Sequence, residues 1–331
     1  MQVSSGFKIV EAEQGKPLIE LNCGKCGSRN PTDNLFCGRC AHILDVRPDL
    51  WLRAEDFQTN SDRDAVSVVK ATGILPHLAY EFLVKPSEQN LRERVIRQGK
   101  PVNSIPNLRA LTSETAYALS LQQLPTVYSV EATGPPNAFT FGSNEAPLIV
   151  VDRRLMEGVG SGELRALLGH EMGHVKSGNM LYHTLAQTLA EGVRLSASFM
   201  GVNTISMPMQ LALLAWQRES EFSADRAGLI ASGDPSHVVS MLARLAGNLG
   251  TSIENASILD SIGQLFGTHP NLNARARAIV EFAKTQEYRN LASRVIFRRD
   301  YRLAFTPICR FCNAAKQVQD LFCPKCGKSQ V

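Results

Sequence analysis

The chain has 331 residues, of which 44% are hydrophobic and 20% are charged, so it can bury a core and wholesale disorder is excluded. Its formal net charge of +4, from 35 basic and 31 acidic residues, is too small to indicate a polyanionic partner. The first residues contain no apolar stretch, so we expect no secretory signal.

The eight cysteines form two quartets, one towards each end of the chain, and both have the spacing C-x2-C-x10-C-x2-C. A disulfide scaffold would scatter cysteines through the fold, whereas paired C-x2-C units present four thiolates to one zinc ion. We predict two structural zinc ions, in segments that resemble zinc ribbons at residues 18–46 and 303–331. Intact thiolates require a reducing compartment, so we expect a cytoplasmic location. The predicted ligand sets are Cys23, Cys26, Cys37 and Cys40, and Cys309, Cys312, Cys323 and Cys326.

Between the quartets we predict a mostly helical α+β core at residues 60–290. Apolar residues have helical spacing at 62–124 and again after residue 151. Three β-rich runs lie between these regions, and because short links favour antiparallel pairing they predict a small antiparallel sheet. The three runs are residues 126–130, 138–141 and 148–151.

The sequence His170-Glu171-Met172-Gly173-His174 lies in a segment whose apolar residues have helical spacing and which Gly178 can end. On a helix the two histidines are i, i+4 neighbours, about 5–6 Å apart at Cβ, so both imidazoles can bind one ion. Glu171 lies about 100° around the helix, where it can act on a water molecule at that ion without binding the ion itself. This H-E-x-x-H pattern predicts a catalytic zinc site.

Catalytic zinc usually takes three protein ligands and a water molecule, so a third ligand is expected. The metzincin extension of the motif is absent, because Ser177 and Met180 stand where glycine and histidine are required. Glu191 is close to the spacing of a thermolysin-type ligand but lacks the sequence around it. The remaining candidate is Glu221. Asp225 lies one turn later on the same predicted helix, where its carboxylate can fix the tautomer of a ligating histidine.

The longest uncharged stretch runs from Leu195 to Gln217. It contains several polar residues and a Gly-Val-Asn-Thr break, whereas a membrane-spanning helix needs about 20 predominantly apolar residues. We interpret the stretch as two buried helical pieces joined by a turn, with a hairpin in a membrane interface as the alternative. We therefore expect no transmembrane segment, and peripheral membrane contact stays open.

Four motifs in this order resemble those of the HtpX and CAAX-prenyl-protease family of gluzincin metallopeptidases, over about residues 60–290. They are Asn137-Ala138-Phe139, the segment 167–178, Glu221-Phe222-Ser223-Ala224-Asp225-Arg226, and Thr268-His269-Pro270 followed by Arg275. Membrane-embedded members carry spanning helices around this core, so the resemblance is to a soluble member with a zinc ribbon at each end. It implies zinc ligands at His170, His174 and Glu221, a general base at Glu171, and a carboxylate behind the ligands at Asp225.

Other residues near the predicted cleft are candidates for further roles. His269, before a proline, is our candidate for stabilising the oxyanion of peptide hydrolysis, with a structural cap as the alternative. Asn137 and Ala138 are candidates for binding the substrate backbone beside the edge strand, although Asn137 also fits a turn. Arg275 is interpreted as a solvated helix residue, with binding to a carboxylate behind the ligands or to a peptide terminus as the alternatives. His183 is assigned no role.

The segment from Tyr288 to Lys316 mixes basic and aromatic residues. Because apolar and polar residues largely alternate in it, we expect a strand pair that packs the second ribbon on the core. An acidic protein partner and a nucleic acid are the alternatives, and the small net charge makes nucleic acid the least favoured.

Together these features predict a zinc-dependent endopeptidase with one catalytic and two structural zinc ions, acting on protein or peptide substrates. The ribbons would recognise partners or substrates, or brace the fold. The alternative is a zinc-ribbon binding or scaffold protein with an inactive peptidase core. The intact catalytic positions favour the enzyme.

Overall fold

The computed structural model describes residues 7–11, 17–31, 34–45, 47–73, 75–131, 137–194, 207–246, 270–304 and 320–330, together with residues 309, 311, 312, 314 and 316. The strands are β1 (Phe7–Glu11), β2 (Pro17–Asn22), β3 (Arg29–Pro31), β4 (Lys100–Pro101), β5 (Thr126–Val130), β6 (Ala138–Phe141) and β7 (Leu148–Asp152). The α-helices are α1 (Asn60–Ala71), α2 (Leu75–Ala79), α3 (Lys85–Gln98), α4 (Pro106–Ala118), α5 (Arg153–Met156), α6 (Ser161–Ser177), α7 (Met180–Arg194), α8 (Met207–Ser232), α9 (Pro235–Leu245), α11 (Pro270–Ala283) and α12 (Gln286–Ala304). Short 3-10 turns occur at Pro48–Leu50, Ala54–Asp56 and Val102–Ser104, and a π-helical turn at Tyr80–Val84.

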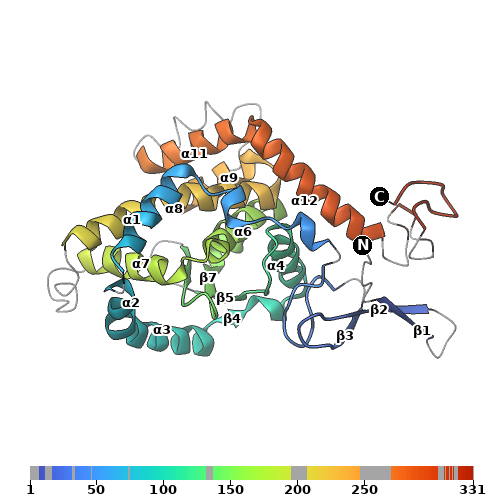
Figure 1. Cartoon of the computed structure of the whole chain (residues 1–331), viewed down its shortest axis with the longest axis horizontal. Coiled ribbons are helices and arrows are strands. Elements are labelled where there is room, and N and C mark those ends of the chain that lie inside the picture. Colours follow the sequence, from blue (N-terminus) through green and yellow to red (C-terminus); the bar gives the residue numbers. More distant parts are fainter. Residues whose placement is uncertain are drawn as a thin grey trace.

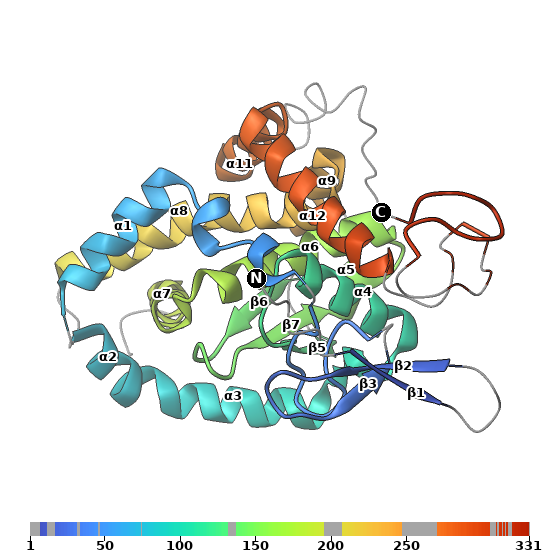
Figure 2. The ribbon, with the colours of Figure 1, turned by 45° about the vertical axis from the view of Figure 1, so that its right-hand side comes forward.

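Helix α6 lies near the centre of the molecule, between α8 and the sheet formed by β4 to β7 (Figures 1 and 2). Every residue of β7 is buried, and its side chains alternate between two apolar clusters. Ile149 and Val151 pack in the main core with the leucines of α6, whereas Leu148 and Val150 pack with Val95 of α3. The mostly helical α+β class predicted from the sequence is therefore confirmed.

The pairing within this sheet differs from the antiparallel prediction. The strand order is β4-β5-β7-β6, and β5 pairs with β7 in parallel, with Val127 beside Ile149. The chain passes from β5 to β6 at the sheet edge and returns through β7, which therefore runs beside β5 in the same direction. Only β6–β7 and β4–β5 are antiparallel. The prediction was wrong here because short links constrain neighbours in sequence, and β5 and β7 are not neighbours.

The first cysteine quartet lies in a ribbon that packs directly on the helical core. Residues 41–43 pair with residues 122–124 through two main-chain hydrogen bonds of 2.9 Å and an antiparallel bridge. Phe36 and Ile43 are buried in the main apolar cluster together with residues of α4 and α6. The strands β1, β2 and β3 form a separate antiparallel sheet that leads into this ribbon.

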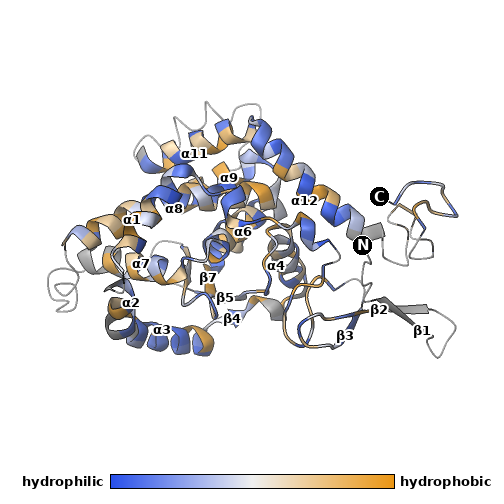
Figure 3. Cartoon of the chain, viewed as in Figure 1, coloured by the Kyte–Doolittle hydropathy of each residue, from blue (hydrophilic) through white to orange (hydrophobic). Residues whose placement is uncertain are grey.

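The predicted strand pair at residues 288–316 is described mainly at 288–304, which belong to helix α12, so the prediction was wrong there. Tyr288 and Leu291 are buried and Val295 is partly buried, which is a helical spacing of three and four residues. Phe297 is 44% exposed, so the alternation in sequence does not correspond to alternating burial. Hydrophilic residues dominate much of α12 and α3 (Figure 3). The predicted core boundary at residue 290 falls within α12.

A buried ion pair fastens α12 to the chain just after the first ribbon. Arg298 is 1% exposed, and its Nε lies 3.3 Å from Oδ2 of Asp45. Asp45 also accepts hydrogen bonds from Trp51 (2.7 Å) and Tyr117 (2.9 Å). Arg298 further donates to Ser120 and to the Tyr117 carbonyl. Separating Asp45 from Arg298 would leave a buried charge uncompensated. The pair therefore stabilises the contact between the end of the first ribbon and α12.

Lys176, near the end of α6, is half-buried close to Arg298 and donates to the Ser120 carbonyl at 2.7 Å. Burial and the repulsion from Arg298 lower the pKa of Lys176 from 10.5 to about 8. Below pH 8 this ammonium is charged in both states, and its burial therefore destabilises the fold. Above the unfolded pKa it is neutral in both states and this cost disappears. The free energy of unfolding should therefore rise between about pH 8 and 10.5, by at most about 3 kcal/mol.

We expect Lys176→Met to remove this rise, as measured by urea unfolding of both proteins across that pH range. Methionine keeps the apolar stem and lacks the titrating group. The same increase with pH in the variant would contradict the assignment.

The predicted helical pieces at residues 195–217 are described only in part. Residues 207–217 belong to α8, which confirms a helix there, whereas residues 195–206 lie outside the described residues. Within the described part of the chain, none of the helices combines the length and apolarity that a membrane-spanning helix needs.

Candidate active site

Helices α6 and α8 bring three candidate metal ligands together. Nε2 of His170 lies 3.5 Å from one carboxylate oxygen of Glu221, and Nε2 of His174 lies 3.5 Å from the other. One donor atom from each of the three residues lies within 4.8 Å of the other two. Ligands about 2.1 Å from a tetrahedral zinc ion lie about 3.4 Å apart, so this group has the size and the N, N, O donors of a catalytic zinc site. The predicted triad is assembled as expected.

Glycines in the motif allow the two helices to approach closely enough for this geometry. A Cβ at Gly169 would lie 2.6 Å from the Ala231 Cβ, and one at Gly173 would lie 2.8 Å from the Ala227 Cβ. On the facing helix, a Cβ at Gly228 would lie 2.8 Å from a carbonyl oxygen of α6. Side chains at these positions would push the helices apart and separate the histidines from Glu221.

Behind the triad, Asp225 and Arg275 form a buried network. Nδ1 of His170 lies 2.9 Å from Oδ1 of Asp225, which orients the ring so that Nε2 faces the site. Arg275 donates to both oxygens of Asp225, at 2.7 and 2.8 Å, and its Nη1 lies 2.8 Å from Glu221. Arg275 is 5% exposed, so its interpretation as a solvated residue was wrong and the first alternative, binding to a carboxylate behind the ligands, is correct.

The network sets the charges of its members. Burial alone would raise the pKa of Glu221 and of Asp225, but Arg275 and His170 hold both below their ordinary values. Burial alone would lower the pKa of His170, whereas its contacts with Asp225 and Glu221 raise it to about 10. Both carboxylates are therefore ionised at neutral pH, as a metal ligand and its supporting carboxylate must be.

Glu171 follows His170 on α6 and contacts the sheet. It is 4% exposed, and its Oε2 accepts a hydrogen bond of 2.6 Å from the hydroxyl of Thr140 on β6. Thr140 is fully buried, so this contact fixes the orientation of the carboxylate. Thr140 was not among the predicted site residues, because its contact joins residues 31 positions apart. The indication that the sequence offered was its position directly after the motif Asn137-Ala138-Phe139.

Asn137, Ala138 and His269 were also predicted to lie at the site. Among the described strands, β6 is at the edge of its sheet, and Ala138 begins it, half-buried and opposite Val151. Asn137 is exposed, and its carbonyl accepts a hydrogen bond of 2.9 Å from the Asp152 amide. His269 lies outside the described residues.

His183 lies next to the site although we had assigned it no role. Its ring stacks on that of His174, with centroids 4.1 Å apart, and it is 3% exposed. Burial and the neighbouring His174 lower its pKa well below the ordinary value, so it is neutral. It is not part of the ligand group. Helix α7 begins three residues after α6 ends, and its packing beside the end of α6 could not be predicted from helical spacing along α6.

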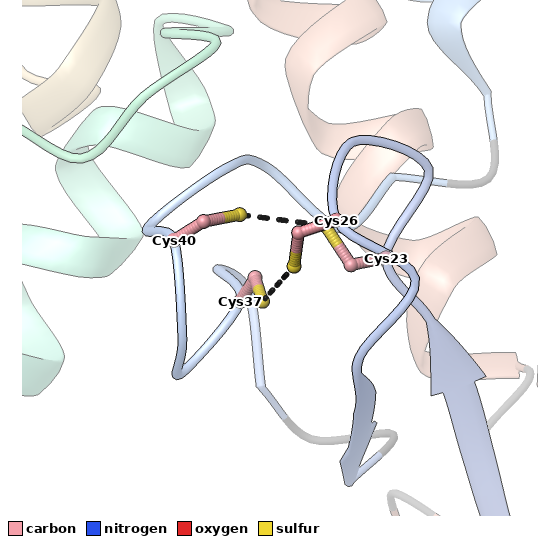
Figure 4. Close-up of side chains that lie close together, drawn as sticks. All are labelled: Cys23, Cys26, Cys37 and Cys40. Atoms are coloured by element: carbon pink, nitrogen blue, oxygen red, sulfur yellow. Dashed lines mark hydrogen bonds between the residues drawn. The ribbon is translucent and has the colours of Figure 1, made fainter.

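Each cysteine quartet also forms a group of the size that one metal ion requires. The four sulfurs of each quartet lie within 4.8 Å of one another, and none of the eight cysteines forms a disulfide. Figure 4 shows the first group, in which Cys23 and Cys40 are 3.6 Å apart and Cys26 and Cys37 are 3.7 Å apart at sulfur. Thiolates about 2.3 Å from a tetrahedral zinc ion lie about 3.8 Å apart, so the fit is close.

The family assignment follows from comparison with known proteins. The model of Peptidase family M48 matches residues 104–283, which include the sheet edge, the triad and Arg275. The chain belongs to peptidase family M48. Membership of a zinc metallopeptidase family, expected from the four motifs, is therefore confirmed.

Two relatives show how far the similarity of this M48 chain extends. It is 31% identical over 269 residues to the plastoglobule-localized metallopeptidase 48, chloroplastic, of Arabidopsis thaliana, covering 73% of this chain and 76% of the relative. It is 30% identical over 224 residues to a protease HtpX homolog of Moorella thermoacetica, covering 56% of this chain and 74% of that protein. No solved structure matches this M48 chain.

Proposed function

We propose that this M48 metallopeptidase is a zinc-dependent endopeptidase that hydrolyses internal peptide bonds of protein substrates. The observation that carries the proposal is the buried group of His170, His174 and Glu221 with Glu171 beside it. When bound by the triad, zinc supplies a Lewis acid and lowers the pKa of a bound water molecule to about 7. The protein side chains supply the general base, the orientation of the ligands and the charge balance of the site.

Glu171 is the proposed general base. Because Thr140 occupies its Oε2, Oε1 is the atom that takes a proton from the attacking water and passes it to the leaving amine. Asp225 keeps Nδ1 of His170 engaged, so that Nε2 stays directed to the metal. Arg275 balances the two carboxylates and keeps them ionised while the site is loaded.

Substrate contacts are proposed on the sheet side of the site. The edge strand β6 lies against α6, so an extended substrate beside Asn137 and Ala138 would place a peptide bond near Glu171. His269 is the proposed donor to the oxyanion that forms when the carbonyl is attacked. In sequence, His269 directly precedes Pro270, the first residue of α11, which carries Arg275.

Each cysteine quartet is proposed to hold one structural zinc ion. Hydrogen bonds from Ser28 and from backbone amides outweigh burial and lower the pKa of Cys37 to about 5, which favours the thiolate that zinc requires. The first ribbon braces the core, because residues 41–43 pair with residues 122–124, and the second recognises a partner. The free thiols support a reducing location, which we propose is the cytoplasm.

The test is digestion of denatured casein by the zinc-loaded chain, with mass spectrometry of the new termini. We expect cuts at internal peptide bonds, loss of cutting after chelation, and recovery when zinc is returned. Release of single terminal residues only, or cutting that survives chelation, would contradict a zinc endopeptidase.

A further inference from the structure

The two ribbons have equivalent backbones. In each ribbon, the residue two positions before the third cysteine accepts a hydrogen bond from the fourth residue after the last cysteine. The Leu44 amide donates to the Leu35 carbonyl at 2.9 Å, and the Gln330 amide donates to the Leu321 carbonyl at 2.8 Å. Each also has an antiparallel bridge that starts at a phenylalanine. The equivalent positions are Leu35 and Leu321, Phe36 and Phe322, Ala41 and Gly327, His42 and Lys328, and Ile43 and Ser329.

The same Leu-Phe pair is covered in one ribbon and exposed in the other. Phe36 is 7% exposed, and it packs in the main core with Leu35 against it. Leu321 is 59% exposed and Phe322 is 62% exposed. Figures 1 and 2 show the second ribbon beyond the end of α12, apart from the first ribbon. Two adjacent large apolar side chains at this exposure are typical of a surface that a partner covers.

The first ribbon shows what such a ribbon binds. Its partner is the extended segment 121–125, which pairs with residues 41–43 and adds Leu121 and Leu124 to the apolar contact. Lys25 of the ribbon donates to the side-chain amide of Gln123 at 3.2 Å. The ribbon therefore binds polypeptide by strand pairing, by apolar contact and by a lysine above the paired strand.

The charges of the second ribbon differ from those of the first. Among its described residues, Asp320 is the only acid, against Lys316, Lys325 and Lys328. Lys325 and Lys328 are exposed, and Lys328 stands where the first ribbon has His42, the residue that faces Gln123. An acidic side chain at the position of Gln123 would therefore meet a lysine.

We propose that the second ribbon docks an extended segment of another polypeptide, which lies along residues 327–329. Apolar side chains of that segment cover Leu321 and Phe322, and acidic side chains between them face Lys328 and Lys325. This deepens the proposed recognition role of the ribbons, and it does not require the peptidase site to be active.

The test is fluorescence anisotropy with a labelled peptide of residues 119–127 in which both glutamines are replaced by glutamate. The protein is the full-length, zinc-loaded Glu171→Gln chain, so the peptide stays intact and a failure of catalysis cannot affect the result. We expect saturable binding that weakens with salt and is tighter than binding of the unaltered glutamine peptide. Leu321→Ser and Phe322→Ser should each weaken binding about tenfold or more, because each removes apolar contact.

Leu211→Ser is the matched control, because Leu211 is 60% exposed on α8, far along the chain from the ribbons. It should leave the affinity unchanged. Zinc content of the ribbon variants establishes that the ribbon still folds. Absence of binding, or binding equally strong in the ribbon variants, would overturn the proposal. Two further outcomes would overturn it if the peptide does not bind. Tight binding of a single-stranded oligonucleotide that Leu321→Ser abolishes would show that the ribbon binds nucleic acid. Self-association that Leu321→Ser abolishes would show that the ribbon binds a second copy of the chain.

Discussion

Replacing Glu171 by glutamine should lower kcat/KM for casein-derived peptides by about 10²- to 10⁴-fold, the usual contribution of a positioned general base. Glutamine has nearly the same shape but cannot accept the proton of the attacking water. Because Glu171 is not one of the three grouped ligands, the variant should keep its catalytic metal. Activity within a fewfold of the parent chain, with the metal retained, would mean that another group is the base.

Thr140→Val provides a graded companion to this variant. It removes the hydrogen bond of 2.6 Å that orients Glu171 and should lower kcat about tenfold or more, with little change in KM. Added to Glu171→Gln, it should cost little further, because Thr140 acts through the carboxylate that is already lost. Equal effects of Thr140→Val in both backgrounds would show that Thr140 acts independently of Glu171.

Replacing Arg275 by glutamine should produce the largest loss of stability at the site. Arg275 is buried between Asp225 and Glu221, and removing it leaves two buried carboxylates without their cation. Breaking a buried pair in this way costs about 3–5 kcal/mol. We expect that loss in urea unfolding of the chain without catalytic zinc, and a smaller loss when zinc is bound, because the ion supplies positive charge at the same carboxylate.

Arg277→Gln is the control on the same helix. Arg277 is exposed and bonds to Asn273, so this change should alter the free energy of unfolding by less than about 0.5 kcal/mol. Equal effects of the two variants would show that Arg275 does not carry the buried network. An Arg275→Gln loss that is the same with and without zinc would show that the metal does not share its charge balance.

Local spacing was sufficient to predict the histidine pair. His170 and His174 are one turn apart on α6, so their pairing follows from helix geometry. Glu221 and Asp225 repeat that spacing on α8, but their place beside the histidines joins two helices and was implied by the resemblance to a known family. The cysteine quartets were predictable for the same reason, because C-x2-C spacing acts within one turn of the backbone.

Contacts that depend on how elements pack were not predictable. The contacts of Thr140 with Glu171, of Arg275 with Asp225 and of His183 with His174 each join two elements, and no periodicity along one element reports them. The same limit explains the parallel pairing of β5 with β7. In α12, alternation over a few residues favoured strands, whereas the buried face has helical spacing over a longer span.

The most direct test of the central claim is the zinc content per chain, measured by elemental analysis in the parent protein and in Glu221→Ala. Two cysteine quartets and one His-His-Glu group predict three zinc ions in the parent chain. Glu221→Ala should retain two, because the ribbons do not depend on α8, and it should lose the activity on casein together with the third ion. Three ions in Glu221→Ala, or activity that persists with two, would contradict a catalytic zinc ion held by Glu221.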